Sequence, residues 1–233
     1  MTDAPRYAIY YAAAPDSALN RFGARLLGYD AHSGEELPFP DSMTLAVPDW
    51  REITRDPRKY GFHATLKAPM MLAAGKTEAE LLTACESFAR SPRTLPMIKP
   101  VVNAIGDFIA VVPSERSAEL EQLAADAVDA LDDFRAPLTA EDRARRNPDR
   151  LTQGQRDYLD RRGYPYVREE FRFHMTLTGR LAAERRDALL AILRQRFAAL
   201  ELGAFAIDSI AVFRQHDANS RFRIVRRYAL TPA

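Results

Sequence analysis

Short apolar runs and segments with helical spacing alternate along the chain. Runs rich in aromatic and β-branched residues predict strands at 6–12, 61–69, 95–113, 171–179, 205–215 and 221–231, with a turn at 103–107 dividing the third run. Apolar residues at helical spacing predict helices at about 16–27, 77–89, 117–131 and 181–200. The segment 29–60 is rich in Pro, Gly and charge, which predicts loops or short irregular structure. The chain therefore has the pattern of a mixed α and β protein.

Cap residues mark the ends of several helices. Thr77 with Glu80, and Thr152 with Gln155, have the spacing of capping boxes. Thr139 is placed to begin a short helix that stops before Pro148. The order strand, helix, two strands then occurs twice, once after residue 63 and once after residue 174. This repeat predicts two lobes, in which the 95–113 strands belong with the first copy and the last two strands with the second.

The sequence H-x-T-L occurs once in each copy, beginning at His63 and at His174. Side chains alternate between the faces of a strand, so each copy is expected to present a histidine, a hydroxyl and a cation on one face and apolar residues on the other. The residues expected to share such faces are His63, Thr65 and Lys67 in the first copy and His174, Thr176, Thr178 and Arg180 in the second. If the two lobes face each other, the two histidines meet across a cleft.

Two imidazoles beside one reacting centre suit displacement at phosphorus. An unperturbed histidine has a pKa near 6.5, so one ring can hold a proton while the other lacks it, and the pair supplies a general acid and a general base. Threonine hydroxyls two residues on can donate hydrogen bonds to the non-bridging phosphoryl oxygens. This chemistry needs no metal, and no metal-binding motif of His or Cys is present in the sequence.

The two H-x-T-L copies resemble the paired signatures of the two-histidine (2H) phosphoesterase superfamily, which includes RNA 2′,3′-cyclic phosphodiesterases and 2′-5′ RNA ligase-like proteins. The resemblance implies an α+β fold of two lobes related by a pseudo-two-fold axis, with an antiparallel sheet and helices in each lobe and a central cleft. It also implies a single bilobed domain over residues 1–233, with the first motif at 63–65 and the second at 174–176.

Further segments are similar to one uncharacterised 2H family that is commonly encoded beside phosphonate-degradation genes. They are RYAIYYA, RKYGFHATLKAPM, FRAPL, GYPYV and FRFHMTLTG. The resemblance implies that His63 and His174 are catalytic and that Thr65 and Thr176 bind the phosphate. For hydrolysis of a cyclic phosphate we expect His174 to be the base and His63 the acid.

Composition narrows the substrate and the location. The 233 residues are 47% hydrophobic and 28% charged, with a formal net charge of only +1, so the chain lacks the basic excess expected for gripping long RNA. An insertion from about 134 to 167 enlarges the approach to the second motif, which also favours a small substrate. No segment has the pattern of a signal peptide or a membrane span, and we expect a cytoplasmic protein in which Cys85 is a buried structural thiol.

Other residues are candidates for substrate binding besides Lys67, Thr178 and Arg180. Arg135 leaves a helix beside a proline turn, with a structural role as the alternative. Tyr164 and Tyr166 precede the second motif and can stack on a base or sugar, with core packing as the alternative.

The sequence therefore favours a metal-independent phosphoesterase that hydrolyses a small cyclic phosphate or nucleotide, with a role in phosphonate metabolism and no cofactor. The alternative is a non-catalytic protein that binds a nucleotide or phosphorylated metabolite in the same cleft. Ligation at the same site is a third reading. A pure binder has no need for two imidazoles, because an arginine holds phosphate better at neutral pH.

Overall fold

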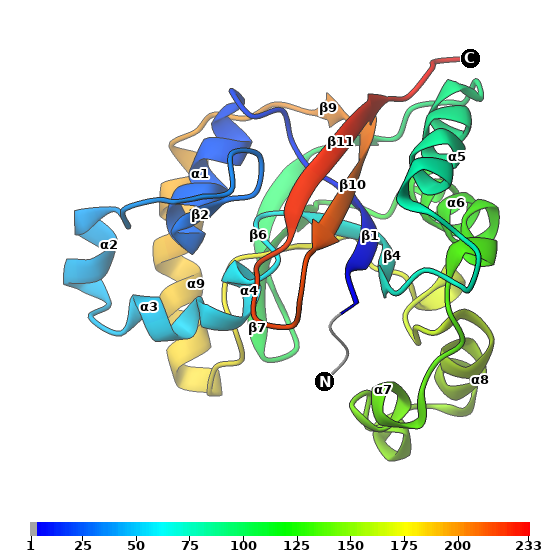
Figure 1. The fold of residues 1–233 in the computed structure, drawn as a ribbon. Helices are drawn as coiled ribbons and strands as arrows, with labels where there is room; N and C mark the ends of the chain where they lie inside the picture. The colour runs from blue at the N-terminus through cyan, green and yellow to red at the C-terminus, as the bar shows by residue number, and fades with distance from the viewer. Residues whose placement is uncertain (1–3) are drawn as a thin grey trace.

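A computed structural model describes residues 4–233 and shows an α+β fold around one seven-stranded sheet (Figure 1). The strands of this sheet are β1 (Arg6–Tyr11), β4 (Ala64–Met70), β6 (Pro100–Ile105), β7 (Phe108–Pro113), β8 (Met175–Thr176), β10 (Ser209–Gln215) and β11 (Arg223–Ala229). Their order is β11-β10-β1-β4-β8-β7-β6, and every neighbouring pair is antiparallel. The predicted α+β class with antiparallel strands is confirmed.

The remaining elements are helices and two short strand pairs. The α-helices are α1 (Ala18–Leu27), α2 (Asp41–Ala46), α3 (Trp50–Ile53), α4 (Arg55–Arg58), α5 (Glu78–Arg90), α6 (Ala118–Ala130), α7 (Ala140–Ala144), α8 (Gln153–Arg162) and α9 (Ala183–Ala198). The 3₁₀ turns are η1 (Asp132–Phe134), η2 (Pro148–Arg150) and η3 (Arg168–Glu170). The short pairs join β2 (Tyr29–Asp30) to β3 (Glu35–Glu36) and β5 (Met97–Ile98) to β9 (Phe205–Ala206). In residues 4–233 no helix has both the length and the apolar character needed to cross a bilayer.

The predicted caps are present. Thr77 caps α5, where its backbone N–H donates to the Glu80 carboxylate at 2.8 Å, and Thr152 forms the same box with Gln155 at the start of α8. Thr139 accepts the backbone N–H of residue 142 at the start of α7. Cys85 lies on the buried side of α5, and burial raises the pKa of its thiol to about 12, as expected of a structural thiol.

The sheet groups the strands differently from the sequence repeat. The first motif strand, β4, lies beside β1 and the C-terminal hairpin β10–β11, whereas β8 lies beside the hairpin β7–β6. The prediction that each hairpin stays with the motif before it is therefore wrong, because the two halves exchange hairpins. Each helix stays with the motif strand that precedes it in the sequence. Helix α5 follows β4 and packs on β10 and β11, and α9 follows β8 and packs on β6 and β7. In Figure 1, α5 and α6 lie to the right of the central strands and α1 and α9 to the left.

One face of the sheet carries most of the core. Ile9, Ala64 and Met175 pack on this face with residues of α1, α5, α6 and α9. A smaller cluster on the opposite face contains Tyr10 and Phe213. We call this second face the open face, and it is the one on which the histidines are expected.

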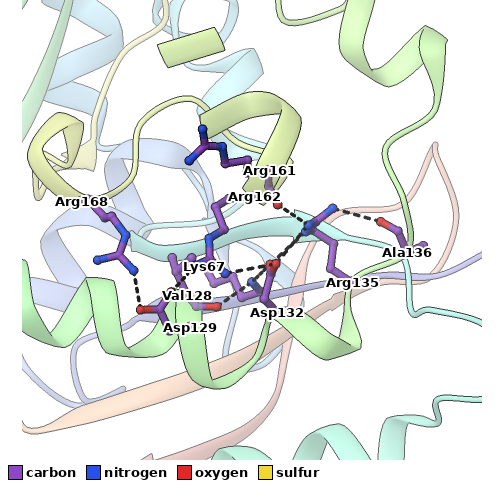
Figure 2. A network of polar contacts seen from close by, with 9 residues as sticks. All are labelled: Lys67, Val128, Asp129, Asp132, Arg135, Ala136, Arg161, Arg162 and Arg168. Carbon is purple, nitrogen blue, oxygen red and sulfur yellow. Dashed lines mark hydrogen bonds and ion pairs between the residues drawn. The ribbon is translucent and has the colours of Figure 1, made fainter. Parts of the chain in front are cut away.

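A β-bulge in β4 turns Lys67 away from the open face. Tyr10 pairs with Thr65, but the next β1 residue, Ile9, pairs with Lys67, so two β4 residues occupy one step of the ladder. Lys67 consequently lies on the helix-covered side with Ile9. Its Nζ donates to Asp132 Oδ1 at 2.8 Å and to the Val128 carbonyl at 3.2 Å (Figure 2). The expectation that Lys67 shares a face with the first motif is wrong.

The second motif strand is shorter than predicted. Only 175–176 pair as a strand, because the backbone N–H groups of Leu177 and Thr178 both donate to the same carbonyl, that of Ile109, at 2.9 and 3.3 Å. Thr178 is fully buried, and its hydroxyl oxygen accepts the Ile109 N–H at 3.0 Å. The expected alternation therefore stops before Thr178, which does not share the face of His174.

An ion-pair network fixes β4 to the helices beside it (Figure 2). Asp132 accepts from Lys67 and from Arg135, whose Nε lies 3.0 Å from Oδ1, and Arg162 lies 3.5 Å from Oδ2. Burial alone would raise the pKa of Asp132, but the hydrogen bonds from Arg135 and Lys67 outweigh it and lower that pKa to about 2. The network connects β4, the end of α6 and the end of α8.

We expect Asp132→Asn to destabilise the fold more than Lys67→Met. Losing the carboxylate leaves buried cations without a counter-charge, which costs about 3–5 kcal/mol in the free energy of unfolding. Losing Lys67 leaves Asp132 paired with two arginines. Urea denaturation measures both, and the exposed neighbour Asp133→Asn is the matched control, expected within about 0.5 kcal/mol of the parent. Equal losses for Asp132→Asn and Asp133→Asn would contradict this account.

Candidate active site

The two motifs meet where the halves of the sheet join. Ala64 and Met175 are the paired residues between β4 and β8, and both side chains are buried on the helix-covered side. Continuing this antiparallel register by one residue in each direction places His63 opposite Thr176 and Thr65 opposite His174. All four side chains then lie on the open face, with the two histidines as diagonal neighbours whose Cβ atoms lie somewhat less than roughly 7–8 Å apart.

Both imidazoles are held in the same way. His63 Nδ1 lies 2.9 Å from the Gly61 carbonyl, and His174 Nδ1 lies 2.7 Å from the Arg172 carbonyl. Because a carbonyl only accepts, each Nδ1 carries the proton and each neutral ring keeps Nε2 as its acceptor. The Thr65 hydroxyl lies 3.3 Å from His63 Nε2. The arrangement leaves two Nε2 atoms for proton transfer.

Gly61 is needed for the first of these contacts. Its φ of +74° lies in the left-handed region, and a Cβ at this position would meet the Ala31 Cβ at 2.7 Å. The turn that presents the Gly61 carbonyl to His63 is therefore suited to glycine.

Aromatic rings surround His63. Tyr10 stacks on it with ring centroids 3.8 Å apart, and Phe213 and Tyr60 lie at 5.9 and 6.1 Å. His174 has one aromatic neighbour, Phe108, at 5.6 Å. We did not predict these residues from the sequence, although the alternation in β1 already separates Tyr10 from its core-facing neighbours.

Burial lowers the pKa of both histidines. It brings the pKa of His63 to about 4, against the opposing effect of the Gly61 carbonyl, and the charge of His174 lowers it further. The pKa of His174 is also lowered by burial, with the Arg172 carbonyl opposing. The effect of the His174 charge on His63 indicates that the two rings lie close together, and burial disfavours the protonated form of both.

The insertion brings one of its two predicted tyrosines toward this site. Burial raises the pKa of Tyr10 well above its usual value, and the charges of Tyr60 and Tyr164 raise it further, so Tyr164 lies within electrostatic range of Tyr10. The Arg146 guanidinium lies 5.1 Å from the Tyr164 ring. Tyr166, by contrast, is 46% exposed and touches Tyr164 edge-on.

The two predicted arginines are placed elsewhere. The Arg135 guanidinium donates hydrogen bonds to Asp132 and, at 2.9 Å, to the Arg161 carbonyl, as expected for a structural role. Arg180 has an 81% exposed side chain, 3.5 Å from Asp107. Within residues 4–233, neither arginine forms a hydrogen bond or an ion pair with either histidine.

A cavity of about 540 Å³ borders the first motif. Tyr60 lines it and also approaches His63, whereas neither histidine lines it. Its other polar walls come from the start of β1, Lys59 and the insertion, including Arg6, Lys59, Arg135, Thr139, Glu141, Asp142, Arg145 and Arg146. In the described part of the chain, no three His, Cys, Asp or Glu side chains are grouped as a metal site requires.

Comparison with known proteins gives a family and several partial relatives. A family model described as "Protein of unknown function (DUF1045)" matches residues 65–223. Two curated relatives are each called ribose 1,5-bisphosphate phosphokinase PhnN. The protein of Janthinobacterium sp. (strain Marseille) is 34% identical over 90% of this chain and 47% of its own length, and that of Laribacter hongkongensis is 31% identical over 95% and 51%. The chain thus spans about half the length of the curated relatives it matches.

Solved structures show weaker similarity over the whole chain. The crystal structure of E. coli LigT complexed with 3′-AMP is 12% identical, has a TM-score of 0.41 and aligns over 97% of this chain and 98% of its own. One described as a phosphoesterase is 15% identical, has a TM-score of 0.40 and aligns over 98% and 99%.

We expect Tyr10→Ala to raise the pKa of His63 toward its usual value of 6.5, because loss of the stacked ring admits water to the imidazole. Tyr7→Ala is the matched control, since Tyr7 lies on the same strand but packs in the core on the opposite face. NMR titration of the His63 ring protons measures the change. An unchanged pKa in the folded Tyr10→Ala protein would contradict the burial account.

Proposed function

We propose that this chain, which belongs to the DUF1045 family of proteins of unknown function, is a two-histidine phosphoesterase that hydrolyses a small cyclic phosphodiester. One observation carries the proposal. The pairing of Ala64 with Met175 supports a facing of two His–Thr pairs on one side of the sheet, and each histidine has its Nδ1 proton engaged by a backbone carbonyl, which leaves Nε2 as the acceptor, beside the Thr65 hydroxyl in the case of His63. Such a pair can accept a proton on one side of a phosphorus atom and donate one on the other.

In the proposed reaction one histidine removes a proton from water as the water oxygen attacks phosphorus. The other protonates the oxygen that leaves as the P–O bond of the ring breaks, so the product is a phosphomonoester. The Thr65 and Thr176 hydroxyls donate to the non-bridging oxygens, whose charge grows in the transition state. An anionic phosphate between the rings raises both histidine pKa values, which allows one ring to hold the proton that the free protein disfavours.

The electrostatics favour one assignment of the two roles. A general base must be neutral, and the pKa of His63 near 4 keeps this ring neutral over most of the pH range. We therefore assign His63 as the base and His174 as the acid, which reverses the assignment made from the sequence.

The names of the relatives bear on the substrate. Hydrolysis of a cyclic phosphate on a phosphorylated ribose would give a ribose bisphosphate, the class of compound in the relatives' name. The phosphokinase activity in that name belongs to proteins of which this chain covers about half. A role in phosphonate metabolism rests on the family resemblance and is part of the proposal.

A purely binding role is less well supported by the site. Burial disfavours the protonated form of both imidazoles, so they hold a phosphate less well than arginines would, and the second motif would add little to a binder. Acid–base chemistry, in contrast, uses both rings.

We expect His63→Ala and His174→Ala each to lower kcat for a 2′,3′-cyclic nucleotide by about 10² to 10⁴-fold. The double variant should lose much less than the product of the two losses, because the rings act as a unit.

Thr65→Ala or Thr176→Ala should each raise the free-energy barrier of the reaction by roughly 1.5–3 kcal/mol, the value of a hydrogen bond to a charged oxygen. Activity should persist with a chelator. Normal turnover in both single histidine variants, or activity restored only by a divalent ion, would refute the proposal.

The assignment of roles has its own test in pH profiles and leaving groups. The profile of kcat/KM should be bell-shaped with both limbs below the usual histidine range, because burial lowers both pKa values in the free protein. In the kcat profile the limbs should move to higher pH, because bound phosphate raises the same pKa values. His174→Ala should remove the basic limb and should cost least with a nitrophenyl ester, whose leaving group needs no acid. If His63→Ala behaves in that way instead, the roles are reversed.

A further inference from the structure

Three cations that have no carboxylate partner within residues 4–233 line the cavity beside the first motif. They are Arg6 at the start of β1, Lys59 before the motif and Arg146 in the insertion. Arg6 Nε donates to the neutral Gln215 amide oxygen at 2.8 Å, Lys59 Nζ donates to the Ala218 carbonyl at 2.8 Å, and Arg146 lies over the Tyr164 ring. Within residues 4–233 none of the three forms an ion pair.

Other charged side chains of the cavity differ in this respect. Arg135 is paired with Asp132, and Arg145 is paired with Asp142. Glu141 is the remaining acidic residue of the lining. The cavity lining therefore has an excess of positive charge. The three cations that carry this excess contact only neutral groups, namely an amide oxygen, a backbone carbonyl and an aromatic ring.

Lys59 lies close enough to Arg6 for the two charges to repel each other. Burial lowers the pKa of Lys59, and the charges of Arg6 and Arg145 lower it further, against the opposing charge of Asp217. Repulsion of this kind destabilises the protein unless an anion occupies the space between the cations.

The same cations lie near the histidine of the first motif. Tyr60 lines the cavity and its ring centroid lies 6.1 Å from that of His63. Arg6 and Tyr10 are on the same face of β1, with Cα atoms roughly 13 Å apart at about 3.3 Å per residue. Tyr10 in turn stacks on His63. A phosphorylated sugar or nucleotide can bridge a gap of this size once the arginine and histidine side chains reach toward it.

We propose that Arg6, Lys59 and Arg146 form a second anion subsite, which binds a phosphate of the substrate that does not react. The substrate is then a small molecule with a phosphomonoester group in addition to the cyclic phosphodiester. Three cations match a phosphate dianion, and guanidinium groups suit its oxygens. This inference rests on the proposed phosphoesterase function for the identity of the reacting group.

The first test compares two substrates that differ only in the second phosphate. They are adenosine 2′,3′-cyclic phosphate with and without a 5′-phosphate. We expect the protein to favour the 5′-phosphorylated form by at least about tenfold in kcat/KM, the effect of roughly 1.4 kcal/mol. Lys59→Gln and Arg146→Gln should each reduce this ratio several-fold. Arg150→Gln, an exposed arginine of the insertion outside the cavity, is the matched control and should leave the ratio unchanged.

The second test does not depend on catalysis. Binding of ribose 5-phosphate is measured by calorimetry in the His63→Ala/His174→Ala protein, where we expect it to persist, and again after adding Arg146→Gln, where it should weaken at least several-fold. If neither cyclic nucleotide is hydrolysed but Arg146→Gln still weakens ribose 5-phosphate binding, the proposed function fails and the subsite stands. If both nucleotides are hydrolysed with equal kcat/KM and the cation variants change neither rate nor binding, the subsite is wrong and the proposed function stands.

Discussion

The pairing of Ala64 with Met175 is the contact on which the candidate site depends. It is the junction between β4 and β8, and it fixes both the register and the facing of the two H-x-T motifs. A slip of one residue in either strand would turn a histidine into the core and bring an apolar side chain to the open face. Because each half of the sheet contains a hairpin from the other half of the sequence, neither half can complete its sheet alone. The geometry of the site is thus tied to the folding of the whole chain.

The sequence predicts correctly those features that depend on residues close together in the chain, and fails for features that depend on contacts distant in sequence. The capping boxes at Thr77 and Thr152 and the pairing of β6 with β7 depend on neighbours a few residues apart, and their prediction was correct. Which hairpin lies beside which motif depends on contacts distant in sequence, and the internal repeat gave the wrong answer. The same holds at the site. Alternation predicted the facing of the first two polar residues of each motif, but the bulge that removes Lys67 is visible only in the register with β1.

Burial of the histidines explains why the site combines aromatic rings with nearby cations. The stack of Tyr10 on His63 excludes water and holds the imidazole ring in place. The same exclusion of water disfavours the protonated imidazole and so lowers the pKa of His63. A neutral pair of imidazoles attracts phosphate weakly, so attraction of an anionic substrate must come from other groups. Arg6, Lys59 and Arg146, which form no ion pair within residues 4–233, line the neighbouring cavity and lie outside the motifs. In the proposed function, this division separates the groups that transfer protons from the groups that hold the charge of the substrate.

The insertion connects this division to the rest of the structure. The insertion brings Arg146 and Tyr164 toward the first motif. Arg135 near its start and Arg162 near its end both contact Asp132, which is bound to Lys67 of β4. The residue that the bulge withdraws from the open face, Lys67, supplies the third cation of that anchor. The β4 bulge therefore turns Lys67 away from the histidines and, through Asp132, helps to position the insertion that provides Arg146. In the proposed function, the groups that transfer protons lie on the sheet, and the cations that hold the second phosphate come from β1, from the segment before β4 and from the insertion packed against the sheet.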